Sequence, residues 1–157
     1  MHVQTCNCCG DTKPINEFPK NGTDNDGKPR WRPDCTVCYT IKRKIDKRKH
    51  TKFVCNTRFR TGEDDTYQLQ DWRDALIFFK GACAYCGRPH SRRFKLTKEH
   101  VIPVDKGGKT VRANIIPACG LCNSSKSNER FESWYSRQKF YAVQRMERIN
   151  QWRSQQA

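Results

Sequence analysis

Four polar residues between positions 99 and 123 have side chains that together could cleave a phosphodiester bond: Glu99, His100, Asn114 and Asn123. Such a reaction needs a base that deprotonates water and a hard divalent cation on the phosphate. His100 can be the base because the ordinary pKa of imidazole lies near neutrality. Glu99 and Asn123 offer the oxygen ligands that Mg²⁺ accepts. Each residue also has a structural interpretation, since Asn123 could cap a helix and Glu99 could be a surface carboxylate.

Pairs of cysteines lie close to these four residues in the sequence. Four Cys-x-x-Cys pairs occur in the chain, at Cys6/Cys9, Cys35/Cys38, Cys83/Cys86 and Cys119/Cys122. Two intervening residues let one turn aim both sulfurs at a single ion, and zinc takes four thiolates in a tetrahedron. Joining successive pairs predicts two structural Zn²⁺ sites, with Cys8 and Cys55 outside both. A disulfide framework is the alternative, but it suits a secreted chain, and no charged-then-apolar leader opens this sequence.

The elements that carry these residues must bring them together. Neighbours on an extended strand point to opposite faces, so Glu99 and His100 converge only where the chain bends or bulges. The pattern predicts a strand over residues 94–97 and a helix that opens at residues 123–126. The second zinc site is expected to fix the distance from the turn after His100 to the helix that carries Asn123.

Further helices and the domain boundaries follow from apolar spacing and turn residues. A helix is predicted over residues 66–80, ending at Gly81, because its apolar side chains recur at intervals of three and four. A short basic helix is expected over residues 39–50, and two helices with a bend near Phe140 are expected at the end of the chain. Residues 1–50 are therefore predicted to be a zinc ribbon with a basic helix, residues 51–65 a linker, and residues 66–157 a second domain.

The chain is strongly basic, with 31 Lys and Arg against 16 Asp and Glu and a net charge of +15. An acidic partner, nucleic acid, is therefore expected. The residues predicted to contact phosphates are Lys42, Arg43, Lys44, Lys47, Arg48, Lys49 and Lys126, although the run at 42–49 could also be a solvated linker. The longest apolar run, residues 75–79, is too short to cross a membrane. Hydrophobic residues are 35% of the chain, which is low for a large core, and bound zinc would supply the missing folding free energy.

Residues 82–126 resemble the HNH endonuclease motif in its zinc-bound form. The elements Cys-x-x-Cys, acid-His-x-x-Pro, Gly-Gly, Asn and Cys-x-x-Cys-Asn-x-x-Lys follow one another in that order. The first 40 residues resemble a zinc ribbon of the kind placed before phage HNH modules. The resemblance implies a small, zinc-stabilised α+β fold, in which an N-terminal ribbon precedes a ββα-metal nuclease module with flanking helices.

The same resemblance implies a role for each polar residue. His100 would be the general base, Glu99 and Asn123 would ligate one catalytic Mg²⁺ or Mn²⁺, and Asn114 would hold the loop that orients His100. Hydrolysis would leave 3′-hydroxyl and 5′-phosphate ends. The sequence departs from the common pattern at Glu99, where Asp is more usual, so that the ligand reaches one methylene further. At the third signature position, Asn123 favours Mg²⁺ or Mn²⁺ over softer ions.

Three functional hypotheses follow. The leading one is a metal-dependent DNA endonuclease, a nickase or a double-strand cutter, acting as a monomer or homodimer. Such a protein is expected in the cytoplasm, encoded by a phage or a bacterium, with no membrane partner. The alternative is a non-catalytic, zinc-containing nucleic-acid-binding protein with a decayed HNH frame. A third is an RNA-directed protein, in which Trp31 and Tyr39 stack on unpaired bases.

Overall fold

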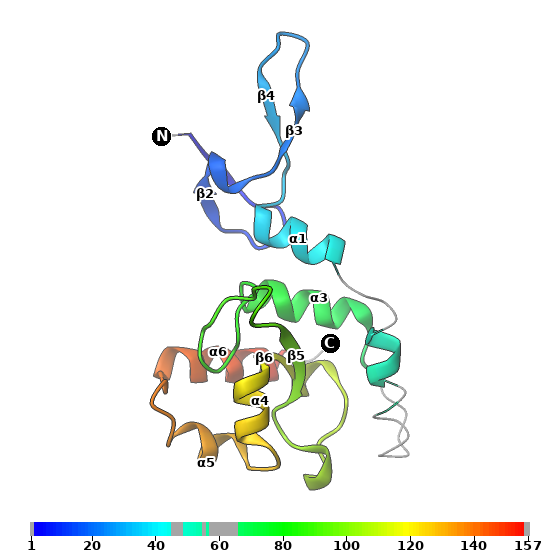
Figure 1. The fold of residues 1–157 in the computed structure, drawn as a ribbon, viewed down its shortest axis with the longest axis vertical. Helices are drawn as coiled ribbons and strands as arrows, with labels where there is room; N and C mark the ends of the chain where they lie inside the picture. Colours follow the sequence, from blue (N-terminus) through cyan, green and yellow to red (C-terminus); the bar gives the residue numbers. More distant parts are fainter. Residues whose placement is uncertain (1, 45–48, 55, 57–65, 156–157) are drawn as a thin grey trace. The chain divides into compact units, whose positions relative to one another are not determined.

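A computed structural model describes residues 2–44, 49–54, 56 and 66–155. The chain divides into two compact units, Met1–Ile45 and Asp46–Ala157 (Figure 1). The division falls after residue 45, whereas the predicted boundary of the ribbon and its helix is residue 50. Within the described ranges, no helix has the length and apolar character needed to traverse a bilayer.

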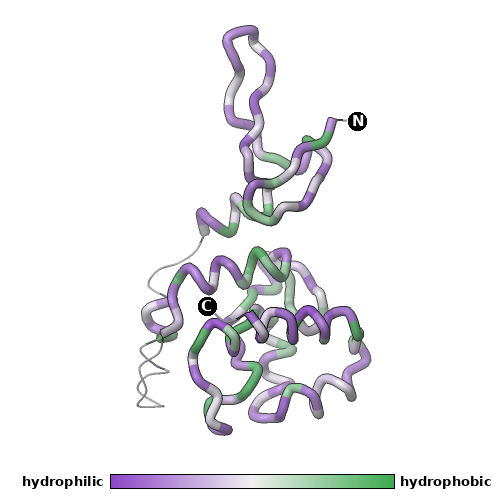
Figure 2. Tube along the Cα trace, turned by 180° about the vertical axis from the view of Figure 1, so that it is seen from behind, coloured by the Kyte–Doolittle hydropathy of each residue, from purple (hydrophilic) through white to green (hydrophobic). Residues whose placement is uncertain are grey.

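The first unit consists of two antiparallel hairpins and a helix. Strand β1 (Val3–Thr5) pairs with β2 (Thr12–Pro14), the 3-10 helix η1 (Ile15–Glu17) follows, β3 (Lys20–Thr23) pairs with β4 (Pro29–Trp31), and α1 (Thr36–Lys44) ends the unit. The β3–β4 hairpin extends away from the rest of the unit and is mostly hydrophilic (Figures 1 and 2). In the described part of this unit the buried side chains are Phe18 and three cysteines. With so small an apolar core, a metal ion held by these cysteines would contribute much of the folding free energy of this unit.

The second unit is a two-stranded sheet covered by helices, and this confirms the predicted α+β class. Its elements in chain order are a helical segment at residues 49–54, α3 (Leu69–Phe78), β5 (Leu96–His100), η2 (Val104–Lys106), η3 (Arg112–Asn114), β6 (Ile115–Cys119), α4 (Gly120–Lys126), α5 (Phe131–Tyr135) and α6 (Val143–Ser154). Strands β5 and β6 are antiparallel. Strand β6 is buried at every position because α3 packs against it and α4 contacts both strands.

Arg112 and Trp152 connect the helices that surround β6. The indole N–H of Trp152 is shared between the carbonyl oxygens of Ile115 (3.0 Å) and Arg112 (3.1 Å). The guanidinium of Arg112 lies 4.2 Å from the Trp152 ring centroid and pairs with Asp74 (2.7 Å) and Asp71 (3.4 Å). These contacts join α3, η3 and α6 around β6, the strand that leads to the Cys119/Cys122 pair.

Two helices begin directly after a cysteine of a Cys-x-x-Cys pair and so differ from their predicted positions. Helix α1 begins at Thr36, directly after Cys35, rather than near residue 39. Helix α4 begins at Gly120, directly after Cys119, and ends at Lys126. The prediction that residues 123–126 open a helix is therefore wrong, because these residues form its last turn.

Two further differences concern the residues around the sheet. The predicted strand at 94–97 is β5, which runs from Leu96 to His100, and its partner β6 lacks the apolar–polar alternation by which a strand is predicted. Residues 51–54, predicted to be linker, are helical. Their Phe53 ring packs edge-on to Tyr67, with 6.1 Å between centroids. Residue 56 is also helical, and the rest of that predicted linker, residues 55 and 57–65, lies outside the described residues.

Candidate functional site

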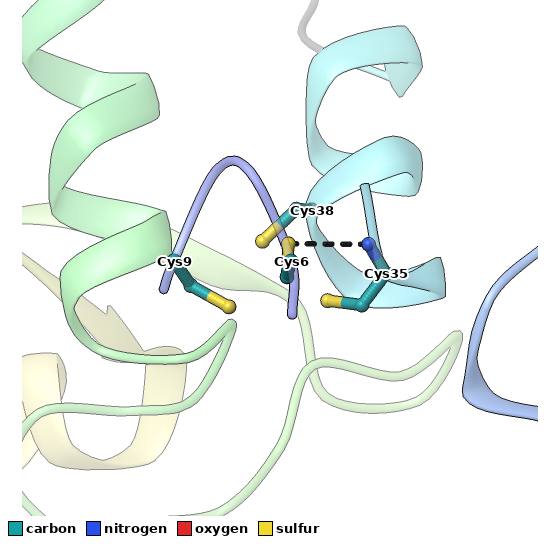
Figure 3. Close-up of side chains that lie close together, drawn as sticks. All are labelled: Cys6, Cys9, Cys35 and Cys38. Carbon is teal, nitrogen blue, oxygen red and sulfur yellow. Dashed lines mark hydrogen bonds between the residues drawn. The ribbon is translucent and has the colours of Figure 1, made fainter. Parts of the chain in front are cut away.

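The four paired cysteines of the first unit meet at one point. Figure 3 shows Cys6 and Cys9 from the first knuckle facing Cys35 and Cys38 at the start of α1. Their Sγ atoms all lie within 4.8 Å of one another. The backbone N–H of Cys35 donates to Cys6 Sγ (3.2 Å), as suits a thiolate. Cys8 lies outside the cluster, and Cys55 lies outside the described residues.

The second cluster joins the turn at residues 83–86 to the junction of β6 and α4. It consists of Cys83, Cys86, Cys119 and Cys122, whose Sγ atoms again lie within 4.8 Å of one another. The sulfurs of Cys86 and Cys119 are 3.9 Å apart. Tetrahedral zinc with bonds of about 2.3 Å places its sulfur ligands about 3.8 Å apart. Both clusters therefore fit a zinc ion, and in the second cluster that ion would fix the turn carrying Cys83 and Cys86 to the start of the helix carrying Asn123.

Each cluster contains a thiol of lowered pKa beside thiols of raised pKa. Burial disfavours ionisation of Cys6, but backbone N–H donors, led by that of Cys35, lower its pKa to about 6. A hydrogen bond from Cys122 lowers the pKa of Cys83 to about 5, against the effect of burial. Its hydrogen bond to Cys83, together with burial, raises the pKa of Cys122 far above the usual range of a thiol. A bound divalent cation would allow all four sulfurs to be thiolates.

A cavity of about 330 Å³ opens at the end of β5. It is lined by Phe53, Asn56, Lys98, Glu99, His100, Pro103, Val104, Asn123, Ser127 and Asn128. Three of the four residues predicted to be catalytic therefore share one cavity. The ladder is regular, with Glu99 opposite Ile116 and His100 opposite Ile115, so no bulge brings the two side chains together. They point to opposite faces, and both line the cavity because β5 ends there.

The imidazole of His100 is held by two residues that the sequence analysis did not identify. Its Nε2 lies 3.0 Å from Oγ1 of Thr110, whose side chain is fully buried. The Phe53 ring stacks on the imidazole, with 5.7 Å between centroids and 29° between planes. When Thr110 accepts this hydrogen bond, the ring proton is on Nε2 and the lone pair is on Nδ1, the tautomer needed for a base at Nδ1.

Asn114 and Gly108 close the loop that carries Thr110. The side-chain amide of Asn114 accepts from the Ile102 N–H (2.8 Å) and donates to the carbonyl oxygens of Ile102 (3.0 Å) and Lys109 (2.9 Å). A Cβ at Gly108 would lie 1.9 Å from the Ile102 carbonyl oxygen, so only glycine permits this approach. Asn114 therefore holds the loop at both ends and sets Thr110 against His100.

Lys126 is buried, so the expectation that it contacts nucleic acid is wrong. Its side chain is 0% exposed, and its Nζ donates to Oε1 of Glu99 (2.7 Å) and to the carbonyl oxygen of His100 (2.8 Å). Burial raises the pKa of Glu99, and the charge of Lys126 opposes that rise. Among the described residues, the second carboxylate oxygen of Glu99 has no hydrogen-bond partner, so it is available as a metal ligand.

Asn123 lies inside α4, one residue after a cluster cysteine, and is not the helix cap. Its Nδ2 donates to the hydroxyl of Thr97 (3.0 Å), which in turn donates to the carbonyl oxygen of Ala118 (3.0 Å). Within the described ranges its Oδ1 has no protein partner. The cavity thus offers one amide oxygen and one carboxylate oxygen, a donor set that fits a hard divalent cation.

The predicted phosphate contacts at residues 42–49 are only partly described. Lys42 pairs with Asp34 (2.7 Å), and the guanidinium groups of Arg43 and Arg32 lie 5.5 and 4.6 Å from the Tyr39 ring centroid. Tyr39, which the RNA hypothesis expects to stack on an unpaired base, therefore already has two cationic neighbours. Lys49 is exposed; the Lys44 side chain, Lys47 and Arg48 lie outside what the structure describes.

Comparisons with known proteins find matches to part of this chain. Residues 83–129 match the family model described as HNH endonuclease. An alignment of 92 residues is 38% identical to YoqL, an SPbeta prophage-derived protein of Bacillus subtilis (strain 168) named as an HNH endonuclease. It covers 52% of this chain and 39% of that protein, so the chain spans well under half the length of this relative.

A crystal structure of the Type II-C Cas9 enzyme from Actinomyces naeslundii matches at 25% identity and a TM-score of 0.43, over 70% of this chain and 13% of that enzyme. The family match lies over the β5–β6 sheet, α4 and the second cysteine cluster. The match includes all four residues of the predicted site. The module built from residues 83–129 is therefore a domain of the HNH endonuclease family.

Proposed function

We propose that the protein is a metal-dependent DNA endonuclease that hydrolyses phosphodiester bonds at the cavity beside β5. The observation that carries this proposal is the shared cavity, because His100, Glu99 and Asn123 all line it. The HNH match over the same residues and the net charge of +15 support a nucleic-acid substrate.

His100 acts as the general base in this mechanism. Thr110 holds the ring by its Nε2–H, so that Nδ1 takes a proton from the attacking water. Glu99 and Asn123 would hold a Mg²⁺ or Mn²⁺ ion, which when bound polarises the scissile phosphate and stabilises the charge on the leaving oxygen. Burial raises the pKa of Glu99, the charge of Lys126 opposes that rise and so favours the carboxylate form, and Asn114 keeps the loop closed. The products would carry 3′-hydroxyl and 5′-phosphate ends.

Plasmid cleavage tests the proposal. Purified protein should nick or linearise supercoiled DNA with Mg²⁺ or Mn²⁺, and His100→Ala should lower the rate by about 10² to 10⁴-fold, the usual contribution of a general base. His90→Ala is the matched control because His90 is exposed and lines neither described cavity. Equal rates for His100→Ala and the wild type, at equal zinc content, would contradict the mechanism.

One observation favours a second candidate, a zinc protein that binds DNA without cutting it. The carboxylate of Glu99 is 7% exposed and already pairs with Lys126, which suits a structural ion pair as well as a metal ligand. Salt-sensitive duplex binding without cleavage, across a panel of divalent ions, would support that candidate.

A further inference from the structure

A second cavity, of about 300 Å³, shares Pro103 as a lining residue with the catalytic cavity. Its floor contains Val101 and Phe131, each 1% exposed. Ile102 stands at its edge with 43% of its surface exposed. Because Pro103 lines both cavities, a ligand that extends past this residue can occupy the two together.

Cations surround this second cavity. Lys106, Arg130 and Arg153 line it, together with one acid, Glu132, which pairs with Arg153 (3.2 Å). Neither Lys106 nor Arg130 has an ion pair or side-chain hydrogen bond with any residue in the described part of the chain. The cavity lining therefore carries a net charge of +2. Like charges gathered around one cavity repel each other, and an anionic ligand would relieve that repulsion.

We propose that this cavity binds a nucleotide of the DNA strand that flanks the scissile phosphate. Lys106 and Arg130 hold its phosphate, and its sugar or base lies against Ile102 and Pro103. Phosphates that position a duplex are commonly held by Lys and Arg, and nucleotides of one strand follow one another at about 3.4 Å along the helix axis. Because the two cavities share Pro103, neighbouring nucleotides of one strand would occupy them. The inference rests on the proposed function.

Binding of DNA to a cleavage-inactive variant tests the inference. In a His100→Ala background, the double variant Lys106→Ala/Arg130→Ala should bind a duplex at least 10-fold more weakly. Its plot of log K against log salt should be shallower by about one unit for each phosphate that is no longer neutralised. Lys95→Ala/Lys139→Ala is the matched control, because both lysines are exposed and line neither described cavity. Equal affinities and slopes for the two double variants would overturn the inference.

Neutral-linkage scanning gives an independent readout. A set of duplexes, each with one methylphosphonate linkage near the mapped cleavage position, removes one phosphate charge at a time. The parent should lose affinity at one flanking linkage, and the Lys106→Ala/Arg130→Ala variant should show no loss there. Suppose that the wild type cleaves DNA, but the His100→Ala parent and its Lys106→Ala/Arg130→Ala variant lose the same affinity at every neutral linkage. The inference is then wrong and the proposed function stands. If the wild type binds but cuts no DNA, the proposed function fails, and the binding comparison still decides the inference.

Discussion

At the residue scale, we expect the hydroxyl of Thr110 to determine how efficiently His100 acts as the general base. Thr110→Val removes the hydroxyl, nearly keeps the volume, and leaves Nε2 without its partner. We expect kcat to fall about 10- to 100-fold with little change in KM, as befits an interaction that matters for chemistry rather than binding. Steady-state kinetics on a duplex substrate, with a pH–rate profile, measure this. Thr110→Ser keeps the hydroxyl and should retain most activity; a Val variant as active as the wild type would contradict the assignment.

Lys126 gives a second prediction at this scale, about stability. Lys126→Met leaves Glu99 buried without its cation, and breaking a buried pair costs about 3–5 kcal/mol. The free energy of unfolding from urea titration should fall by that amount at pH 7. Adding Glu99→Gln should recover part of it, since the uncompensated carboxylate is gone, whereas the exposed Lys139→Met should change little.

The pH dependence of that loss has a definite sign. Burial raises the pKa of Glu99 above its usual value, and without Lys126 nothing opposes the rise. A carboxyl with a raised folded-state pKa is stabilising below its unfolded pKa and loses that contribution as the pH rises through the folded pKa. The Lys126→Met deficit should therefore shrink as the solution is acidified. A deficit independent of pH would show that poorer packing, rather than the unpaired charge, causes it.

At the element scale, each cysteine cluster is predicted to hold one zinc ion beside the start of a helix. Metal analysis should find two zinc ions per chain in the wild type. Cys38→Ser and Cys122→Ser should each retain about one, because a structural site needs all four ligands. Cys8→Ser is the control and should retain two, since Cys8 lies outside the first cluster. Loss of a zinc ion in the Cys8 variant would contradict that ligand set.

The elements also show how far sequence reasoning reaches. Both cysteine clusters could be predicted, because Cys-x-x-Cys spacing is a local property tied to one ion. The presence of Asn114 near His100 was predictable only through the family resemblance. Strand β6 was not predictable, because its burial depends on α3 and α4 and leaves no alternation. Phe53 and Thr110 contact His100 through tertiary packing alone, and a single phenylalanine or threonine carries no local signal.

At the scale of the whole molecule, the charge is distributed over two compact units, each with its own cysteine cluster. A zinc ion with four thiolates carries a charge of −2, so two filled sites lower the formal +15 to +11. The chain remains basic enough for long-range attraction to DNA. The predicted cutting residues all lie in the second unit, whereas the predicted phosphate-contacting run is divided, with Lys42, Arg43 and Lys44 in the first unit and its remaining residues in the second.

This division predicts different kinetic effects for the loss of each zinc ion. Cys38→Ser disrupts the first unit, so we expect KM for DNA to rise and its salt dependence to weaken while kcat changes little. Cys122→Ser detaches the first turn of α4 from the cysteine turn at residues 83–86, which displaces Asn123 from the cavity. We expect kcat to fall at least 10²-fold there, since small misplacements of catalytic groups are costly. Steady-state kinetics on one duplex at two salt concentrations separate the cases. If Cys38→Ser lowers kcat as strongly as Cys122→Ser, the first unit takes part in the chemistry and the assignment of separate roles is wrong.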